Sequence, residues 1–348
     1  MPVFGVEEYI LKSSESIKAQ RYTNWELIIV DDGSPDRSIE IATAFWADDP
    51  RVRIVRHSRN RGLSQARNTG LMLAEGQYVW FPDPDDTYDP ELLEDIKNAL
   101  NKSHASVVMF GHTEEWYKSN GGFSHRRSVC EESDETLTRK QLRSLALHFE
   151  ETTAYGYAWN KVYELQYLRA NQLEFNEVDY IEDIEFNVRV FQNLNSLAVI
   201  ARPYYHYAKR PAVSLTGKYN SNFFALHVAR IRLLYDQLYE WEGLVNEEAL
   251  GKLGLFLCRY IVATLRMNCY DGSGMTHRDR VDWCKRLYDD GFVASLVYAA
   301  ESPRDFVLRV CVEALKKRRI RSLIFIGRVV YVVERYFYPV MSKLKDNR

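Results

Sequence analysis

Short apolar runs alternate with amphipathic segments through the first third of the chain. The runs cover residues 26–30, 52–55, 78–81 and 107–110, and each is rich in β-branched or aromatic residues. Helical patterns lie between them, at about 6–20, 36–48, 63–74 and 90–101. This alternation predicts an α/β domain with a mostly parallel sheet flanked by helices. Such sheets bind ligands at the carboxyl ends of their strands.

The rest of the chain changes character twice. Residues 112–137 are polar and lack clear periodicity, which predicts a loop or a small antiparallel insertion. Helices are expected at about 138–149 and 159–170, with a short strand near 197–200. After about residue 220 the pattern is helical almost throughout. We therefore expect a first domain over residues 1–215 and a helical region over residues 216–348.

Composition places the chain among ordinary globular proteins. Of its 348 residues, 46% are hydrophobic and 27% are charged. The formal net charge of -2 conceals a strong asymmetry, because residues 301–348 contain 12 Lys and Arg against 5 Asp and Glu. That segment carries +7 and the preceding part therefore carries -9. The acidic body argues against a nucleic-acid partner, and the basic end suggests a surface that contacts something anionic.

The cysteines and the first residues bear on the compartment. The five cysteines are scattered and show no C-x-x-C spacing, so neither a disulfide framework nor a zinc site is expected. No basic segment followed by an apolar stretch opens the chain, which leaves no recognisable signal peptide. These features favour a reducing, cytoplasmic location.

Two successive carboxylates follow the first predicted strand, in Val30-Asp31-Asp32-Gly33-Ser34. A turn explains part of this segment, because Gly33 supplies backbone freedom and Ser34 is a good helix cap. Capping does not require two acidic residues, and one of them could accept a hydrogen bond from the N–H of a base such as uracil. A strand-to-helix turn and a nucleobase contact are both open at this point.

Arg67 lies in the segment Asn60-Arg61-Gly62-Leu63-Ser64-Gln65-Ala66-Arg67-Asn68, again between a predicted strand and a helix. A cation in the first turns of a helix at this edge of the sheet could face a diphosphate, to which a guanidinium offers paired hydrogen bonds. A solvated arginine is the alternative.

The most informative segment is Phe81-Pro82-Asp83-Pro84-Asp85-Asp86. Prolines lack N–H groups, so the chain must leave the sheet here. In an extended chain residues i and i+2 point the same way, which places the carboxylates of Asp83 and Asp85 on one side. Such a pair favours Mg²⁺ or Mn²⁺, with phosphate oxygens and water completing the shell. A solvated acidic turn is the alternative.

Taken in order, these motifs resemble the nucleotide-sugar glycosyltransferases of family 2, which have the GT-A fold. The resemblance rests on the segments around Asp32, Asn60-x-Gly62, Ala66-Arg67-Asn68-x-Gly70 and Asp83-x-Asp85-Asp86, over about residues 1–110. Trp159-Asn160-Lys161 and Glu182-Asp183 resemble later motifs of the family and extend the match to about residue 216. Each motif alone is weak, but the ordered combination is specific.

The resemblance implies a Rossmann-like GT-A domain and a role for each matched residue. The resemblance implies a nucleotide-sugar donor, expected to be a UDP-sugar, bound by Pro2, Phe4, Asp32, Asn60, Arg67, Asp83, Asp85, Arg210 and Ser214. Asp85 and Asp83 would hold Mg²⁺ or Mn²⁺, with Asp85 as the most direct ligand. Residues 206–214 resemble a loop that closes on the diphosphate. Trp159 and Lys161 would lie on the acceptor side.

The resemblance also implies the chemistry. Asp183 would be the general base that deprotonates an acceptor hydroxyl, with Glu182 beside it, and transfer would invert the anomeric carbon. A positioned carboxylate of this kind contributes roughly 10²- to 10⁴-fold to a rate. The acceptor would be a saccharide or a lipid-linked saccharide in cell-surface glycan synthesis. Without the resemblance, Glu182 and Asp183 could equally be favourable charges in a first helical turn.

Two other functions fit parts of the sequence. Asp83-Pro84-Asp85-Asp86-Thr87 also matches the D-x-D-x-T pattern of haloacid-dehalogenase-like phosphohydrolases, but no G-D-x-x-x-D element follows and the motifs at Asp32 and Arg67 would be unexplained. A non-catalytic nucleotide-binding or saccharide-binding protein is the second alternative. The retention of Asp183 together with both metal carboxylates speaks against it.

The two ends of the chain add one expectation each. Lys316-Lys317-Arg318-Arg319-Ile320-Arg321 precedes an apolar run that is too short and too charged for a membrane span. A helix at the membrane surface, at the inner face, is expected there, with a packed helical cap or a dimer surface as alternatives. Similar enzymes carry an apolar strand before the segment at Pro2 and Phe4. We therefore expect the natural product to begin upstream of Met1.

Overall fold

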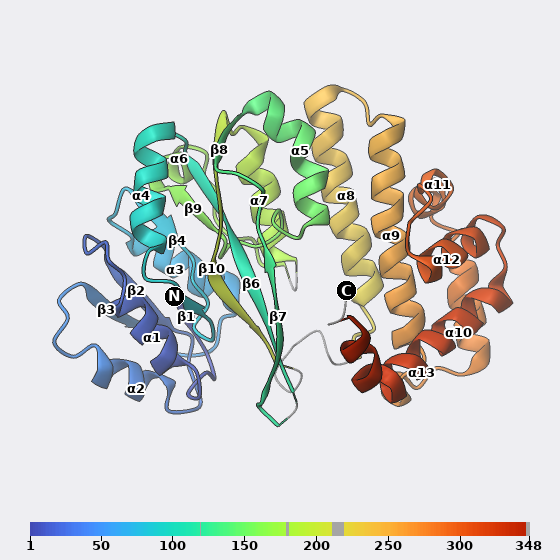
Figure 1. The fold of residues 1–348 in the computed structure, drawn as a ribbon, viewed down its shortest axis with the longest axis horizontal. Coiled ribbons are helices and arrows are strands. Elements are labelled where there is room, and N and C mark those ends of the chain that lie inside the picture. The colour runs from blue at the N-terminus through green and yellow to red at the C-terminus, as the bar shows by residue number, and fades with distance from the viewer. Residues whose placement is uncertain (119, 179–180, 211–218, 346–348) are drawn as a thin grey trace. The chain divides into compact units, whose positions relative to one another are not determined.

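The computed structural model describes residues 1–118, 120–178, 181–210 and 219–345 (Figure 1). The chain forms two compact units, Met1–Ser214 and Leu215–Arg348. The first unit contains every described strand, and the second contains only helices and turns.

A small parallel sheet opens the first unit. Its strands, in spatial order, are β1 (Pro2–Val3), β2 (Leu27–Asp31) and β3 (Val52–Arg56). The connecting helices are α1 (Ile10–Lys18), α2 (Ser38–Phe45) and α3 (Leu63–Leu73). Every residue of β2 is buried, which explains its continuous apolar sequence. The predicted strands and helices of this part are confirmed, with ends that differ by a few residues.

The second sheet is mixed. Its strands are β4 (Tyr78–Trp80), β5 (Thr87–Tyr88), β6 (Val107–Tyr117), β7 (Phe123–Val129), β8 (Glu135–Thr138), β9 (Lys161–Glu164) and β10 (Ser196–Lys209). Their order is β4-β9-β6-β10-β5, with β7 on β6 and β8 on β10. Among the described pairings of this sheet, only β6 with β10 is parallel. The expected parallel pairing therefore holds for the first sheet but not for the second, where strands close in sequence such as β6 and β7 pair antiparallel.

Four further helices belong to this unit: α4 (Leu92–Ser103), α5 (Arg139–Glu151), α6 (Leu165–Ala170) and α7 (Glu182–Gln192). The helix expected over 159–170 is wrong in its first part, because Lys161–Glu164 pairs with both β4 and β6 as a strand. That pairing buries Val162 and Tyr163, which outweighs the local helical pattern. The antiparallel insertion expected within 112–137 is confirmed by β7 and β8.

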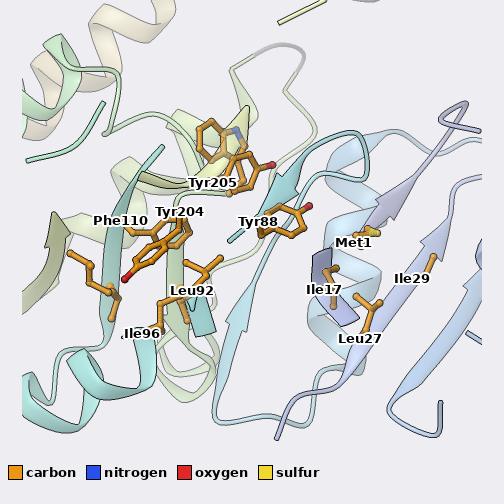
Figure 2. Packing of buried hydrophobic residues seen from close by; sticks show 14 of the residues in the cluster. Met1, Ile17, Leu27, Ile29, Tyr88, Leu92, Ile96, Phe110, Tyr204 and Tyr205 are labelled. Atoms are coloured by element: carbon orange, nitrogen blue, oxygen red, sulfur yellow. The ribbon is translucent and has the colours of Figure 1, made fainter. Parts of the chain in front are cut away.

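The two sheets share one hydrophobic core. Figure 2 shows Tyr88 between a group from the first sheet, with Met1 and Ile29, and a group from the second, with Phe110 and Tyr205. Trp80 meets the Tyr88 ring edge-on, at 4.7 Å between ring centroids. The carboxyl ends of β2 and β4 are therefore attached to a single packed body.

The second unit is helical, as predicted for the region after residue 220. Its helices are α8 (Phe223–Glu242), α9 (Glu247–Met267), the short 3₁₀ helix η2 (Asp271–Ser273), α10 (His277–Arg286), α11 (Gly291–Ala299), α12 (Phe306–Lys316) and α13 (Ile320–Lys345). Gly254 lets α9 approach α11 closely, since a Cβ there would lie 2.2 Å from the Leu296 carbonyl oxygen. Within the described residues, none of the helices combines the length and the apolar character needed to cross a bilayer.

Candidate active site

Asp32 follows β2 and is surrounded by hydrogen-bond donors. Its Oδ1 accepts a hydrogen bond from the backbone N–H of Arg61 at 2.8 Å and lies 2.6 Å from Nδ1 of His57. Its Oδ2 accepts from the N–H of Gly62 at 2.8 Å. The side chain is almost completely buried. Asp32, the first residue after β2, therefore also holds the backbone of the loop after β3 in place.

The neighbouring turn is closed by Asp31, not by a serine cap. Oδ1 of Asp31 accepts from the Ser34 N–H at 2.8 Å, and α2 begins only at Ser38. The alternative in which Ser34 caps the following helix is therefore wrong. Gly33 has φ +76°, and a Cβ there would lie 3.0 Å from the backbone nitrogen of Asn60. This contact lets the turns after β2 and β3 pack directly on each other.

Three other residues that are expected to bind the nucleotide sugar lie at this edge of the first sheet. Pro2 is buried in β1, next to β2. Phe4 follows that strand and is 48% exposed, which leaves its ring accessible. Oδ1 of Asn60 accepts from the Gly62 N–H at 3.1 Å, so its side chain supports the turn that Asp32 also holds.

Arg67 connects two of the expected functional carboxylates. It lies on α3 with its side chain 1% exposed. One Nη donates to Oδ1 of Asp183, and the other donates to Oδ1 of Asp83 at 3.2 Å. Burial opposes the positive charge, but Asp183 and Asp83 outweigh it and raise the pKa of Arg67. The guanidinium therefore stays charged between the two carboxylates.

Asn68, the next residue of α3, helps to fix the direction of the Arg67 side chain. Its side-chain amide makes two hydrogen bonds with the backbone of Phe175, each of 2.8 Å. Ser64 adds a hydrogen bond to the carbonyl oxygen of Asn176 at 2.9 Å. The start of α3 is thus fastened to the segment that precedes α7, the helix that carries Asp183.

The three aspartates after β4 have different surroundings. Asp83 and Asp85 are partly exposed, at 24% and 35% of their side chains. Burial raises the pKa of Asp83 to about 6 despite Arg67, and burial also raises the pKa of Asp85 despite Arg210. Asp86 is buried and accepts from the Tyr205 hydroxyl and the Ala208 N–H, both at 2.8 Å.

These surroundings give the three aspartates two different roles. Asp83 and Asp85 face a solvent-accessible region at the carboxyl end of β4 and could contact a ligand or an ion. Asp86 points inward and fastens the end of β10 to the loop after β4. The raised pKa values of the outer pair mean that their negative charge is under-compensated in the free protein.

Glu182 and Asp183 begin α7, as expected. The partly exposed Asp183 carboxylate accepts from Arg67 at Oδ1 and from the Ala158 N–H at Oδ2, over 3.1 Å. Burial and the neighbouring Asp183 charge raise the pKa of Glu182 to about 7. Asp183 is therefore held as the acceptor of two donors while its side chain keeps access to solvent.

Trp159 and Lys161 are both buried, which changes the expectation for one of them. The Trp159 ring stacks on Tyr157 and Tyr205, with centroids 4.4 and 4.1 Å apart. Nζ of Lys161 lies within 3.1 Å of the carbonyl oxygens of Ala154, Tyr155 and Tyr157. A fully buried ammonium with its donors taken cannot also bind an acceptor. Lys161 is instead a support for the 154–157 segment.

Arg210 comes from the end of β10 and reaches back to the motif after β4. Its Nη2 donates to the Asp85 carbonyl oxygen at 3.0 Å, and Nη1 lies 3.5 Å from the Asp85 carboxylate. The ring of Tyr9 stacks against the guanidinium, 4.0 Å from its central carbon. Ser214, the other residue expected in this loop, lies outside the described residues.

Comparison with known proteins identifies the first part of the chain. The model of the family described as "Glycosyl transferase family 2" matches residues 1–165. Residues 1–165 belong to glycosyl transferase family 2. An uncharacterized glycosyltransferase of Bacillus subtilis, EpsJ, is 28% identical over 275 residues, which cover 77% of this chain and 76% of EpsJ. Glycosyltransferase GlyG of Streptococcus pneumoniae is 35% identical over 123 residues, 35% of this chain and 40% of GlyG.

The family 2 domain also has the expected fold. The crystal structure of residues 1–349 of Staphylococcus aureus TarS in complex with UDP-GlcNAc superposes with a TM-score of 0.63. The superposition covers 94% of this chain and 89% of that chain, at 21% sequence identity. The predicted α/β GT-A fold with a helical C-terminal region is therefore confirmed. Over residues 1–165 the chain is therefore similar to family 2 glycosyltransferases, and EpsJ matches over 275 residues.

The site of this family 2 domain suits a hard divalent cation bound together with a ligand. No group of three or more His, Cys, Asp or Glu side chains in the described part of the chain could hold a metal alone. The two outer carboxylates, Asp83 and Asp85, supply oxygen donors whose charge is under-compensated. Mg²⁺ typically takes one or two carboxylates and completes its shell with phosphate oxygens and water. The donor set fits that arrangement.

One residue of the family 2 site was missed by sequence reasoning. His57 lies directly after β3 and contacts Asp32 through Nδ1 and Thr69 through Nε2. The signal that marks it is its position, because His57 is the first residue after β3 just as Asp32 is the first residue after β2.

Proposed function

We propose that the chain is an inverting glycosyltransferase that moves a sugar from a UDP-sugar to a hydroxyl group of a saccharide or a lipid-linked saccharide. The observation that carries this proposal is the bridge made by Arg67 between Asp183 and Asp83. It brings a solvent-accessible carboxylate that can accept a proton next to the carboxylates that could contact a sugar diphosphate. Neither a binding protein nor a simple hydrolase needs both the proton-accepting carboxylate and the carboxylates that could contact the sugar diphosphate.

Asp183 takes the role of general base in this proposal. Two donors orient its carboxylate, which leaves it placed to accept a proton from an acceptor hydroxyl. The hydroxyl oxygen then attacks the anomeric carbon while the bond to the diphosphate breaks on the opposite face, which inverts the configuration. The adjacent Glu182 helps to shape the acceptor side.

The donor lies along the carboxyl edge of the sheets in this proposal. Phe4 stacks on the nucleobase, while Pro2, Asp32 and Asn60 form the walls of the base site. Arg210 faces the diphosphate, whose leaving oxygen gains negative charge during transfer, and the buried Arg67 adds its charge from behind Asp83. The complex of TarS with UDP-GlcNAc supports the choice of a uridine nucleotide.

A divalent cation, Mg²⁺ or Mn²⁺, would be held by Asp85 and Asp83. When bound, it would neutralise charge on the departing diphosphate. Asp85 is the more exposed of the two and is contacted mainly by Arg210, whereas Asp83 is engaged by Arg67. Ser214, which lies outside the described residues, would complete the donor site. The stacked ring of Trp159 supports the acceptor side from beneath.

Screening donors by thermal stabilisation tests this function. The purified chain is heated with UDP, UDP-sugars, GDP-sugars, CDP and ADP, each with Mg²⁺, with Mn²⁺ or with EDTA. We expect a rise in melting temperature with uridine nucleotides that is larger with the metal, because a ligand that binds only the native state stabilises it. Stabilisation by no nucleotide under any of these conditions would contradict the proposal.

We also propose that α13 contacts the surface of an anionic membrane, which would suit a lipid-linked acceptor in cell-surface glycan synthesis. Arg321, Phe325, Arg328, Val332 and Arg335 are all exposed and follow one another at helical spacings of four and three. Basic residues near an anionic bilayer contribute roughly 1 kcal/mol each. The alternating apolar residues could insert between head groups.

Vesicle sedimentation tests the membrane proposal. The chain should sediment with vesicles that contain phosphatidylglycerol and not with pure phosphatidylcholine vesicles. The double variant Arg321→Glu with Arg328→Glu should lose this binding. The double variant Arg278→Glu with Arg304→Glu makes the same change in net charge at exposed sites off α13 and should retain it. Equal binding by both double variants would contradict a contact through α13.

A further inference from the structure

We infer that His57 is a positioning residue that sets the uracil preference of the donor site through Asp32, an inference that rests on the proposed function. The His57 side chain is 6% exposed and the Asp32 side chain 4% exposed. They are 25 residues apart in the sequence, and the ends of β2 and β3 bring them together. His57 also donates its backbone N–H to the Asp31 carbonyl oxygen at 2.8 Å.

The direction of the side-chain hydrogen bond is determined by its partners. A carboxylate oxygen only accepts hydrogen bonds, so Nδ1 of His57 carries the hydrogen that points to Oδ1 of Asp32. The other ring nitrogen, Nε2, lies 2.9 Å from the hydroxyl oxygen of Thr69 on α3. The imidazole is therefore fixed at both ends and cannot turn without losing a contact.

This arrangement leaves Asp32 with one free acceptor position. Oδ1 is saturated by two donors, Nδ1 of His57 and the N–H of Arg61. Among the described residues, Oδ2 accepts from the N–H of Gly62 alone, so one of its two lone pairs is left for a ligand. A single free acceptor suits a base that presents one ring N–H at its edge, as uracil does. Cytosine presents a ring nitrogen that accepts, which would meet the carboxylate unfavourably.

The same contacts link the base site to the diphosphate site. Thr69 lies two residues after Arg67 on α3, so the imidazole connects the turn after β2 to the helix that aims the guanidinium. Removing the imidazole leaves Oδ1 with the N–H of Arg61 as its single donor and so weakens the hold on the Asp32 carboxylate. We expect this to weaken recognition of the base more than the transfer step.

Calorimetric titration with UDP and CDP tests the inference on the full chain with Mg²⁺ present. For His57→Ala we expect the Kd for UDP to rise at least tenfold, about 1.4 kcal/mol, and the preference for UDP over CDP to fall. His57→Asn should recover part of both, because its amide can still donate to Asp32. Thr69→Val should give a smaller loss. His148→Ala, at an exposed histidine on α5, is the matched control.

The outcomes separate this inference from the proposed function. If the unaltered chain binds UDP but His57→Ala binds UDP and CDP as the unaltered chain does, the role of His57 is contradicted and the function stands. A lower melting temperature with unchanged Kd values would make His57 a structural residue only, which also contradicts the inference. If the unaltered chain binds none of the nucleotides, both proposals fail.

Discussion

Arg67 donates a hydrogen bond to the carboxylate of Asp183 from a side chain that is almost completely buried. The same guanidinium holds Asp83, so the proposed base and the proposed donor site share one charge. Loss of Arg67 would leave two partly buried carboxylates without the cation that they share, which is strongly destabilising.

Asp183→Asn should abolish transfer while leaving the donor site in place. The amide keeps the shape of the side chain but cannot take a proton at neutral pH. We expect kcat to fall by roughly 10²- to 10⁴-fold, the usual contribution of a positioned base. The Kd for UDP should change less than threefold. Near-normal turnover by this variant would remove Asp183 from the role of base.

Arg67→Lys should lower activity even though the charge is kept. A lysine ammonium is a compact point charge and cannot present two parallel donors to Asp183 and Asp83. We expect kcat/KM to fall by at least tenfold, measured with the donor found by thermal screening. Arg61→Lys is the control, because Arg61 is exposed and its side chain contacts Gln65. Equal effects at both positions would mean that the bridge is unimportant.

Asp85→Ala and Asp86→Ala should fail in different ways. Asp85→Ala should weaken metal-dependent donor binding with little change in melting temperature, since burial already disfavours its charge. Asp86→Ala leaves the Tyr205 hydroxyl and the Ala208 N–H without an acceptor, which costs about 1–3 kcal/mol for each buried group. Urea unfolding and donor titration of both variants measure the contrast. A loss of stability in Asp85→Ala together with a loss of donor binding alone in Asp86→Ala would contradict these roles.

Lys161→Met should destabilise the first unit. The ammonium is fully buried and contacts three backbone carbonyl oxygens, which would lose their charged donor. Burial lowers the pKa of Lys161 well below its usual value, and the charges of Asp183 and Glu150 offset part of that shift. We expect the free energy of unfolding to fall by about 2–4 kcal/mol. Lys140→Met, at an exposed position on α5, should change it little. An unaltered midpoint for Lys161→Met would contradict the support role.

Glu182→Gln should make stability depend less on pH. The pKa of Glu182 is raised from 4.5 to about 7 in the folded chain, so folding favours its protonated form. That contribution is complete below the unfolded pKa and is lost as the pH rises through the folded pKa. The variant should match the unaltered chain near pH 5 and melt at a higher temperature at pH 8. A difference that does not change between these pH values would contradict the raised pKa.

The sequence predicted the first sheet well because its signals are local. The fully buried strand β2 has a continuous apolar sequence. Asp32 and Arg67 follow strands of this sheet, at the carboxyl edge where parallel sheets bind ligands. The β9 strand was missed because Lys161–Glu164 becomes a strand only through pairing with β4 and β6, which are distant in sequence. The mixed second sheet could not be inferred for the same reason.

The sequence predicted which residues form the candidate site better than it predicted the contacts between them. The motifs pointed to Asp83, Asp85 and Asp183, and the structure places the first and last of these on one guanidinium. Sequence could not show that Lys161 is buried and saturated, or that His57 reaches Asp32. Both facts depend on side chains that meet only after the sheets have formed.

The most direct test is the release of UDP from UDP-sugars by the purified chain and by Asp183→Asn. Each donor of a UDP-sugar panel is incubated with Mg²⁺ or Mn²⁺, with and without a saccharide acceptor mixture, and UDP is quantified by chromatography. We predict that at least one donor is consumed by the unaltered chain, and at least 100-fold more slowly by Asp183→Asn although it still binds UDP. Equal rates for the two proteins, or no consumption of any nucleotide sugar, would contradict the account.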